Sequence, residues 1–252
     1  MLREPPIFKG WQLSLCAAAG EAGGGFVSSR PRPPGVRCGP AADPERSREE
    51  AGRRARSRMR RYCAANGLNR LGTLTYAGSG VHDPRQARAD VGVFFRRLRA
   101  ETGGKPFPYV WVPEWHKSGH GLHLHFAVGD FIARGKIDRA WGHGFVHIKL
   151  LGDLPVGSGS FAQSRKAAGY LSKYVGKSFD DDAAGVRRPR GLHRFDVAQG
   201  YTPRKVLLQG ASRDEVLEAA AGAMGGPPDV FWSSDEAVDW QGPPAVWVQW
   251  RG

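Results

Sequence analysis

A histidine-hydrophobic-histidine triplet stands inside 122–128, a run of residues typical of a β-strand. Because side chains alternate across a strand, His123 and His125 point to one face and their apolar neighbours to the other. A second strand-like run, 109–115, precedes this one and carries Glu114, so a hairpin would bring the carboxylate close to both imidazoles. Two histidines and one carboxylate leave coordination positions open, as a catalytic divalent metal requires.

Two more histidines, His116 and His120, lie in the turn between these runs. They leave open an alternative in which four histidines hold a structural zinc ion. We favour the strand pair with Glu114, because those three side chains are placed by regular structure.

A second pattern lies in 161–177, which the sequence predicts to be a helix. Residues three and four positions apart share one face of a helix, and here that face carries Tyr170, Lys173, Tyr174 and Lys177. Positive charge favours a phenolate, so a tyrosine beside lysines is easier to ionise. Its oxygen is then a nucleophile, and the lysines can stabilise a pentacovalent phosphate. The two patterns together predict attack of a tyrosine on a metal-polarised phosphodiester.

The charge balance indicates the partner. The 252 residues include 37 Lys and Arg but only 24 Asp and Glu, a net charge of +13. An excess of this size is typical of proteins that bind a polyanion, above all a nucleic acid. The three cysteines, Cys16, Cys38 and Cys63, form no CxxC pair, and no apolar run approaches the ~20 residues of a membrane span. We expect a reduced, soluble, intracellular protein without a membrane partner; the sequence specifies no oligomeric state.

The elements that position these residues alternate between strands and helices. Alternation and apolar stripes predict strands at 71–76, 109–115, 122–128 and 145–150, and helices from Asp83-Pro84 onward, at 136–141 and at 161–177. This order predicts an α+β fold, in which helices pack on an antiparallel, ferredoxin-like or RRM-like sheet.

Four segments divide the chain. Residues 1–42 are rich in Gly and Pro and are expected to be poorly ordered. A basic helix at 43–66, opened by Asp43-Pro44, is either a solvated surface or a phosphate-contacting arm. The catalytic domain covers 67–180. The extension 181–252 contains a short helix after the capping-box residue Ser212 and a Trp-rich tail, for which packing is favoured over partner binding.

These motifs resemble the HUH endonucleases, and among them the two-tyrosine initiators of rolling-circle replication in plasmids and single-stranded DNA phages. Residues 72–76 (GTLTY) resemble the family's first-strand motif, and His123-Leu124-His125 its metal motif. Glu114 stands where the family often has its third ligand. The run 170–177 (YLSKYVGK) fits the two-tyrosine motif YxxKYxxK. The resemblance covers about residues 70–179.

The resemblance implies the HUH endonuclease fold and a nickase that cuts single-stranded or hairpin origin DNA. Tyr170 or Tyr174 would form a 5′-phosphotyrosine and release a 3′-hydroxyl primer, with Lys173 and Lys177 supporting the phosphate and Mg²⁺ or Mn²⁺ as the metal. The host DNA polymerase would extend the primer in the cytoplasm of a bacterial cell. The sequence contains no GxxxxGK[ST] loop, so a host helicase is expected to unwind the DNA.

Other functions use similar residues. Related HUH transposases and conjugative relaxases share the chemistry, although small transposases usually have one tyrosine and relaxases three histidines. A non-catalytic DNA- or RNA-binding module would instead stack bases on strand aromatics such as Tyr109, Trp111 and Phe126. Metal-dependent hydrolysis of another substrate is a third alternative, but the HExxH signature of zinc proteases is absent.

Overall fold

A computed structural model of the protein describes residues 8–29, 43–149, 160–183 and 193–251. The chain divides into two compact units, a larger one formed by 45–202 and a smaller one formed by 1–44 together with 203–252. None of the described helices has both the length and the hydrophobicity needed to cross a membrane.

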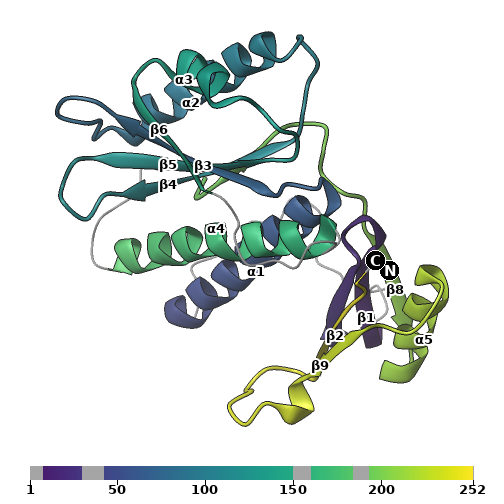
Figure 1. Ribbon diagram of the computed structural model, residues 1–252. Helices are drawn as coiled ribbons and strands as arrows, with labels where there is room; N and C mark the ends of the chain where they lie inside the picture. Colours follow the sequence, from purple (N-terminus) through teal and green to yellow (C-terminus); the bar gives the residue numbers. More distant parts are fainter. Residues whose placement is uncertain (1–7, 30–42, 150–159, 184–192, 252) are drawn as a thin grey trace, which may run out of the picture. The chain divides into compact units, whose positions relative to one another are not determined.

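The larger unit is an antiparallel sheet between two layers of helices (Figure 1). Its strands lie in the order β6-β3-β5-β4-β7. Helices α2 and α3 cover one face, and α1 and α4 the other. The elements are α1 (Pro44–Ala65), β3 (Arg70–Tyr76), α2 (Pro84–Glu101), β4 (Tyr109–Trp115), β5 (Leu122–Val128), α3 (Arg134–Trp141), β6 (Gly144–Lys149), α4 (Ser160–Ala183) and β7 (Asp196–Val197).

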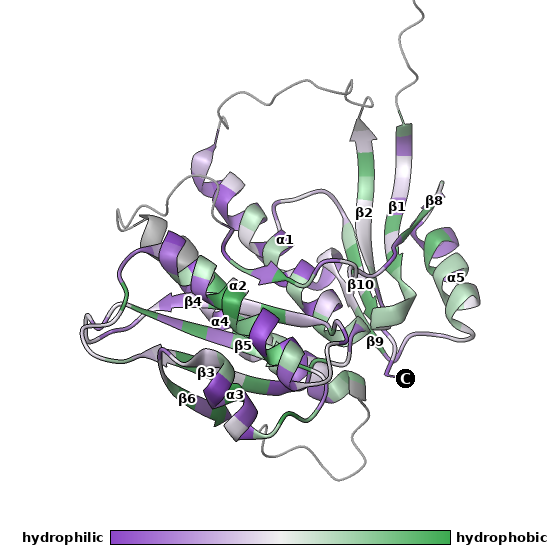
Figure 2. Cartoon of the chain, turned by 90° about the horizontal axis from the view of Figure 1, so that it is seen from above, coloured by the Kyte–Doolittle hydropathy of each residue, from purple (hydrophilic) through white to green (hydrophobic). Residues whose placement is uncertain are grey.

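Alternation along the strands gives each face its own core, and the stripes of hydrophobic and hydrophilic residues are visible in Figure 2. Leu74 and Phe126 pack with α2 and α3, whereas Val112 and Ala127 pack with α1 and α4. Gly72 of the first-strand motif has a packing reason, because a Cβ there would lie 2.3 Å from ring carbons of the buried Phe126.

The predicted elements are confirmed with small shifts at their ends. Strands β4 and β5 form the expected hairpin, in which Glu114 pairs with His123. Helix α2 begins at Pro84, and Asp83 caps it by accepting a hydrogen bond from the Arg85 amide. The last residue of the predicted strand 145–150, Leu150, lies outside the described residues.

The basic helix is not a separate segment, as the division at 66 and 67 predicts. Met59, Tyr62 and Cys63 of α1 are fully buried against the same core as α4. Burial of this apolar side fixes α1 to the sheet and leaves its arginines on the outside, so α1 belongs to the larger unit.

The expectation of a poorly ordered N-terminal segment is wrong for residues 8–29, while 1–7 and 30–42 lie outside the described residues. Strands β1 (Phe8–Cys16) and β2 (Glu21–Ser29) form a hairpin at the centre of a second antiparallel sheet, ordered β8-β1-β2-β10-β9. Its other elements are β8 (Val206–Gly210), α5 (Arg213–Met224), β9 (Val230–Ser233) and β10 (Ala245–Gln249). Glycine composition indicates disorder only where no partner strand is available, and here partners come from the far end of the chain.

The C-terminal extension is likewise divided. Strand β7 joins the larger sheet, residues 184–192 lie outside the described residues, and the remainder completes the smaller unit. The predicted short helix is confirmed as α5, whose cap Ser212 accepts a hydrogen bond from the Glu215 amide. Trp250 packs with the strands in the apolar core of the smaller unit, as the packing interpretation of the tail predicts.

Candidate active site

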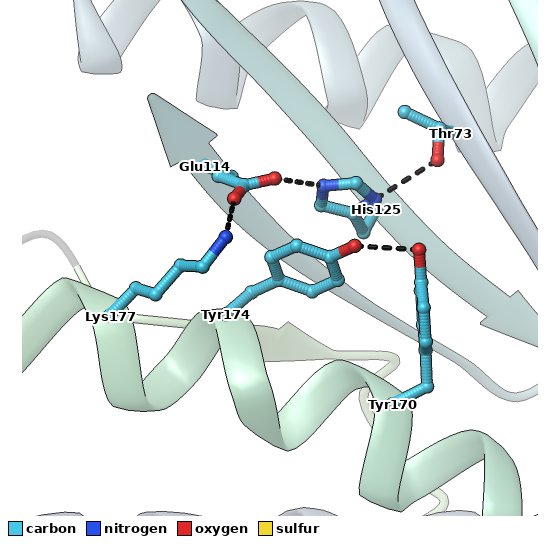
Figure 3. A network of polar contacts seen from close by, with 6 residues as sticks. All are labelled: Thr73, Glu114, His125, Tyr170, Tyr174 and Lys177. Carbon is cyan, nitrogen blue, oxygen red and sulfur yellow. Dashed lines mark hydrogen bonds and ion pairs between the residues drawn. The ribbon is translucent and has the colours of Figure 1, made fainter. Parts of the chain in front are cut away.

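The two groups of chemistry-bearing residues face one another across one side of the larger sheet (Figure 3). His125 on β5 and Glu114 on β4 point toward α4, and Tyr170, Tyr174 and Lys177 point from α4 back toward the strands. The expected meeting of imidazoles and phenols is therefore present, and it arises because α4 buries Leu171 and Val175 against the sheet.

His125 is the centre of this network. Its ring is 5% exposed and stacks on the Tyr174 ring, with centroids 3.7 Å apart and planes within 9°. Nε2 lies 2.8 Å from Glu114 Oε2, and Nδ1 lies 3.0 Å from Thr73 Oγ1. Burial lowers the pKa of His125, against the opposing effect of Glu114. The neutral ring donates from Nε2 to the carboxylate and accepts at Nδ1 from the threonine hydroxyl.

Glu114 connects the strands to the tyrosine helix. Its Oε1 pairs with the Lys177 ammonium, while Oε2 accepts from His125. Burial raises the pKa of Glu114, but the hydrogen bonds from Lys177 and His125 outweigh burial and leave the pKa below its ordinary value. The carboxylate is therefore ionised and carries two donors.

His123 sits beside this network without a hydrogen-bond partner for its buried Nε2. It stacks on His116, with ring centroids 4.2 Å apart, and His120 lies edge-on at 6.5 Å. Burial and the neighbouring histidines lower the pKa of His123 to about 4. A neutral imidazole with an unsatisfied buried nitrogen is suited to a ligand that supplies the missing interaction.

The donor set of His123, His125 and Glu114 suits a divalent cation in its chemistry. Metal ligands must be deprotonated, and all three groups have pKa values that favour this state. Two ligand atoms about 2.1 Å from an octahedral cation lie about 3 Å apart, close to the 2.8 Å between His125 Nε2 and Glu114 Oε2. The orphaned nitrogen of His123 is the third donor, and Lys177 holds the remaining carboxylate oxygen.

As the side chains stand, no three His, Cys, Asp or Glu residues within the described part of the chain converge to hold a metal. This finding overturns the four-histidine zinc alternative. In the turn, the ring nitrogens of His116 and His120 instead contact Ser118 Oγ and the Tyr76 carbonyl. The cysteines offer no further ligands there, because Cys16 and Cys63 are free and buried, and Cys38 lies outside the described residues.

The two tyrosines contact each other directly. Tyr174 Oη donates a hydrogen bond to Tyr170 Oη at 2.6 Å, and the rings meet edge to face with centroids 5.3 Å apart. Burial raises the pKa of Tyr174, and the hydrogen bond to Tyr170 raises it further. The expectation that neighbouring lysines make the phenols easier to ionise is therefore wrong for Tyr174, because burial exceeds the effect of the lysines.

The lysines of α4 differ in position. Lys177 lies 5.1 Å from the centre of the Tyr174 ring, but Lys173 is exposed, and within the described residues no hydrogen bond or ion pair links it to the site. The cation beside Tyr170 is Lys149 of β6, whose Nζ lies 3.9 Å from the ring centre. Neither Lys149 nor Thr73 is among the site residues predicted from the sequence. Thr73 lies within the first-strand motif, whereas only the pairing of β6 with β3 reveals Lys149.

The strand aromatics named for a base-stacking module are not available on the surface. Trp111 and Phe126 are 6% and 1% exposed, and Tyr109 stacks on Phe95 with centroids 3.5 Å apart. They belong to the core beneath α2 and α3. This form of the non-catalytic alternative is therefore wrong.

Comparison with known proteins agrees with the geometry. Residues 69–179 match the model of a replication-associated protein family, named for the protein ORF2, which consists of rolling-circle replication initiators of the HUH type. The matched range includes every site residue that the sequence predicts, and it confirms the resemblance and the fold class. It supports a rolling-circle initiator in general. No curated protein and no solved structure gives a significant match.

Proposed function

We propose that this protein, whose residues 69–179 match the ORF2 replication-associated family, initiates rolling-circle replication by nicking single-stranded or hairpin origin DNA. The observation that carries the proposal is the packing of Tyr174 on His125, with Tyr170 within hydrogen-bond reach of Tyr174. Two nucleophiles and a cluster of candidate metal ligands thus share a space into which a single phosphate can enter.

Glu114, His123 and His125 would hold Mg²⁺ or Mn²⁺. When bound, such a cation withdraws charge from the non-bridging oxygens of the scissile phosphate. The chain itself supplies further positive charge from Lys149 at Tyr170 and Lys177 at Tyr174. These ammonium groups would stabilise the additional negative charge of the pentacovalent phosphate.

In the first transfer, a tyrosine oxygen forms a bond to phosphorus as the bond from phosphorus to the 3′ oxygen breaks. The phenol loses its proton and the leaving 3′ oxygen gains one, so the products are a 5′-phosphotyrosine and a free 3′-hydroxyl. The second tyrosine, one helical turn away, can accept a later strand without hydrolysis. The released hydroxyl would prime a host polymerase after a host helicase opens the duplex, in the cytoplasm of a bacterial cell.

The decisive experiment is mass spectrometry of the covalent adduct. Incubation of the full chain with origin single strands and Mn²⁺ should attach an oligonucleotide to Tyr170 or Tyr174. The double variant Tyr170→Phe/Tyr174→Phe should bind the same DNA and form no adduct. Absence of an adduct with every divalent metal tested would leave DNA binding without nicking.

The histidines are tested by separating cleavage from affinity. His123→Ala and His125→Ala should lose cleavage and keep most of the DNA affinity, because contacts of Arg and Lys with phosphates dominate binding. Loss of both together, with a lowered melting temperature, would make the histidines structural.

A further inference from the structure

The edge strand β6 presents a row of exposed side chains beside the candidate site. Phe145, His147 and Lys149 alternate along β6, and all three are exposed, Phe145 at 69%. We call these three residues the β6 row. An exposed phenylalanine on an ordered strand calls for an explanation, because nothing in the packing of the larger unit uses its ring.

The β6 row faces the same side of the sheet as the catalytic residues. Phe145 pairs with Thr75, and His147 pairs with Thr73, so their side chains share a face with Thr73. Thr73 in turn contacts His125 on that face. The side chains between them, Val146 and Ile148, belong to the opposite core.

The β6 row is also continuous with the tyrosines. The Lys149 ammonium lies 3.9 Å from the centre of the Tyr170 ring. Since β6 is an end strand of its sheet, the row leads from an open edge of the larger unit directly to Tyr170.

We propose that the β6 row binds the single-stranded DNA next to the scissile phosphate, with Phe145 stacking on a base and Lys149 contacting the backbone. This inference rests on the proposed nicking function and specifies where its substrate lies. Alternate residues of a strand are roughly 6.7 Å apart, so aromatic and cationic side chains repeat along an extended path. An exposed ring next to cations that follow a backbone is the arrangement by which single strands are held without sequence readout.

Charge favours DNA over a second protein chain as the occupant. The larger unit contains 28 of the 37 Lys and Arg residues and 14 of the 24 Asp and Glu residues, a net charge of +14. Two copies of so basic a surface repel each other, whereas a phosphate backbone is attracted to it.

The test measures affinity of the full chain for a labelled single-stranded origin oligonucleotide, by fluorescence anisotropy with a chelator present to prevent cleavage. Phe145→Ala should bind about ten-fold more weakly, because one base loses its stacking partner. Phe145→Trp should bind as well as the original protein, and Phe145→Leu should remain weak, since leucine is apolar but cannot stack. The matched control is Phe231→Ala, which removes a 44% exposed ring from the smaller unit and should leave affinity unchanged.

The adduct assay at saturating DNA separates this proposal from the nicking function. Phe145→Ala should still form the tyrosine adduct once DNA is saturating. Unchanged affinity of Phe145→Ala, with the adduct still formed by the original protein, would overturn the β6 row alone. Weaker binding by Phe145→Ala without any adduct in the original protein would support the row as a DNA contact and refute nicking. A change in oligomeric state on light scattering, with unchanged DNA affinity, would make the row a protein interface and overturn the proposal.

Discussion

Tyr170 and Tyr174 share one helix face, but their surroundings differ in ways that affect reactivity. Tyr174 is packed on the His125 ring, and burial raises its pKa. Tyr170 accepts the Tyr174 hydrogen bond and lies beneath the Lys149 ammonium. A donated hydrogen bond and a nearby cation both stabilise a phenolate, so Tyr170 is the better first nucleophile.

Separate single variants test this order. Tyr170→Phe should lose the first cleavage of a simple single strand, whereas Tyr174→Phe should still form an adduct and lose only the second transfer. Single-turnover assays, with the adduct mapped by mass spectrometry, distinguish the two steps. Equal loss of first cleavage in both variants would show that the tyrosines are interchangeable.

Lys177 and Lys173 have the same spacing from a tyrosine yet different contacts. Lys177 pairs with the carboxylate that would bind a metal, and Lys173 is exposed. Lys177→Ala should therefore lower the Mn²⁺ concentration needed for half-saturation, because an ammonium no longer competes for Glu114. Lys173→Ala is the matched control and should leave this concentration unchanged. Calorimetric titration with Mn²⁺ measures both, and weaker Mn²⁺ binding by Lys177→Ala would contradict the competition.

Among the elements, β2 shows why a glycine-rich run can be an ordered strand. A Cβ at Gly24 would lie 1.9 Å from the backbone oxygen of Gln12, and one at Gly25 would lie 2.4 Å from that of Pro244. The neighbouring strands approach β2 so closely that only glycine fits. The run is a packing requirement of the smaller sheet.

Gly24→Ala should accordingly destabilise the smaller unit by about 2 kcal/mol, through overpacking against the backbone. The control in the same unit is Gly222→Ala in α5, where a Cβ meets nothing within 4 Å and helix propensity improves. Thermal unfolding followed by circular dichroism compares them. A Gly24→Ala protein as stable as the original would refute the close approach of β1 and β2.

At the scale of the whole molecule, positive charge is concentrated in one unit. The larger unit has a net charge of +14, so the smaller unit, with 9 basic and 10 acidic residues, contributes −1. Electrostatic attraction of DNA therefore belongs to the catalytic unit. The exposed arginines of α1 contribute to it, in keeping with the phosphate-contacting interpretation of the basic helix.

Salt dependence tests this distribution of charge. In the full chain, Arg48→Ala/Arg54→Ala on α1 should weaken DNA binding and reduce the slope of log affinity against log salt by roughly 1 for each arginine that neutralises a phosphate. The matched pair Arg204→Ala/Lys205→Ala removes the same charge from exposed positions of the smaller unit and should leave the slope unchanged. Equal effects of the two pairs would place DNA on both units.

The sequence by itself determined the parts of the site that depend on local periodicity. Alternation along a strand places His123 and His125 on one face, and helical spacing places Tyr170 and Tyr174 together. Both rules act over a few residues and need no knowledge of the partner element. The hairpin that brings in Glu114 is also local, because a short turn joins its strands.

Only the tertiary structure decided which groups meet across distant parts of the chain. Lys177 reaches Glu114 over 63 positions, and Lys149 reaches Tyr170 because α4 lies across the edge of the sheet. The smaller unit depends on pairing of β1 with β8 and of β2 with β10, strands from opposite ends of the chain. Backbone pairing is available to any strand of matching shape, so no residue pattern within β1 or β2 specifies these partners. The burial that opposes ionisation of Tyr174 is decided in the same way, by the packing of α4 on the sheet.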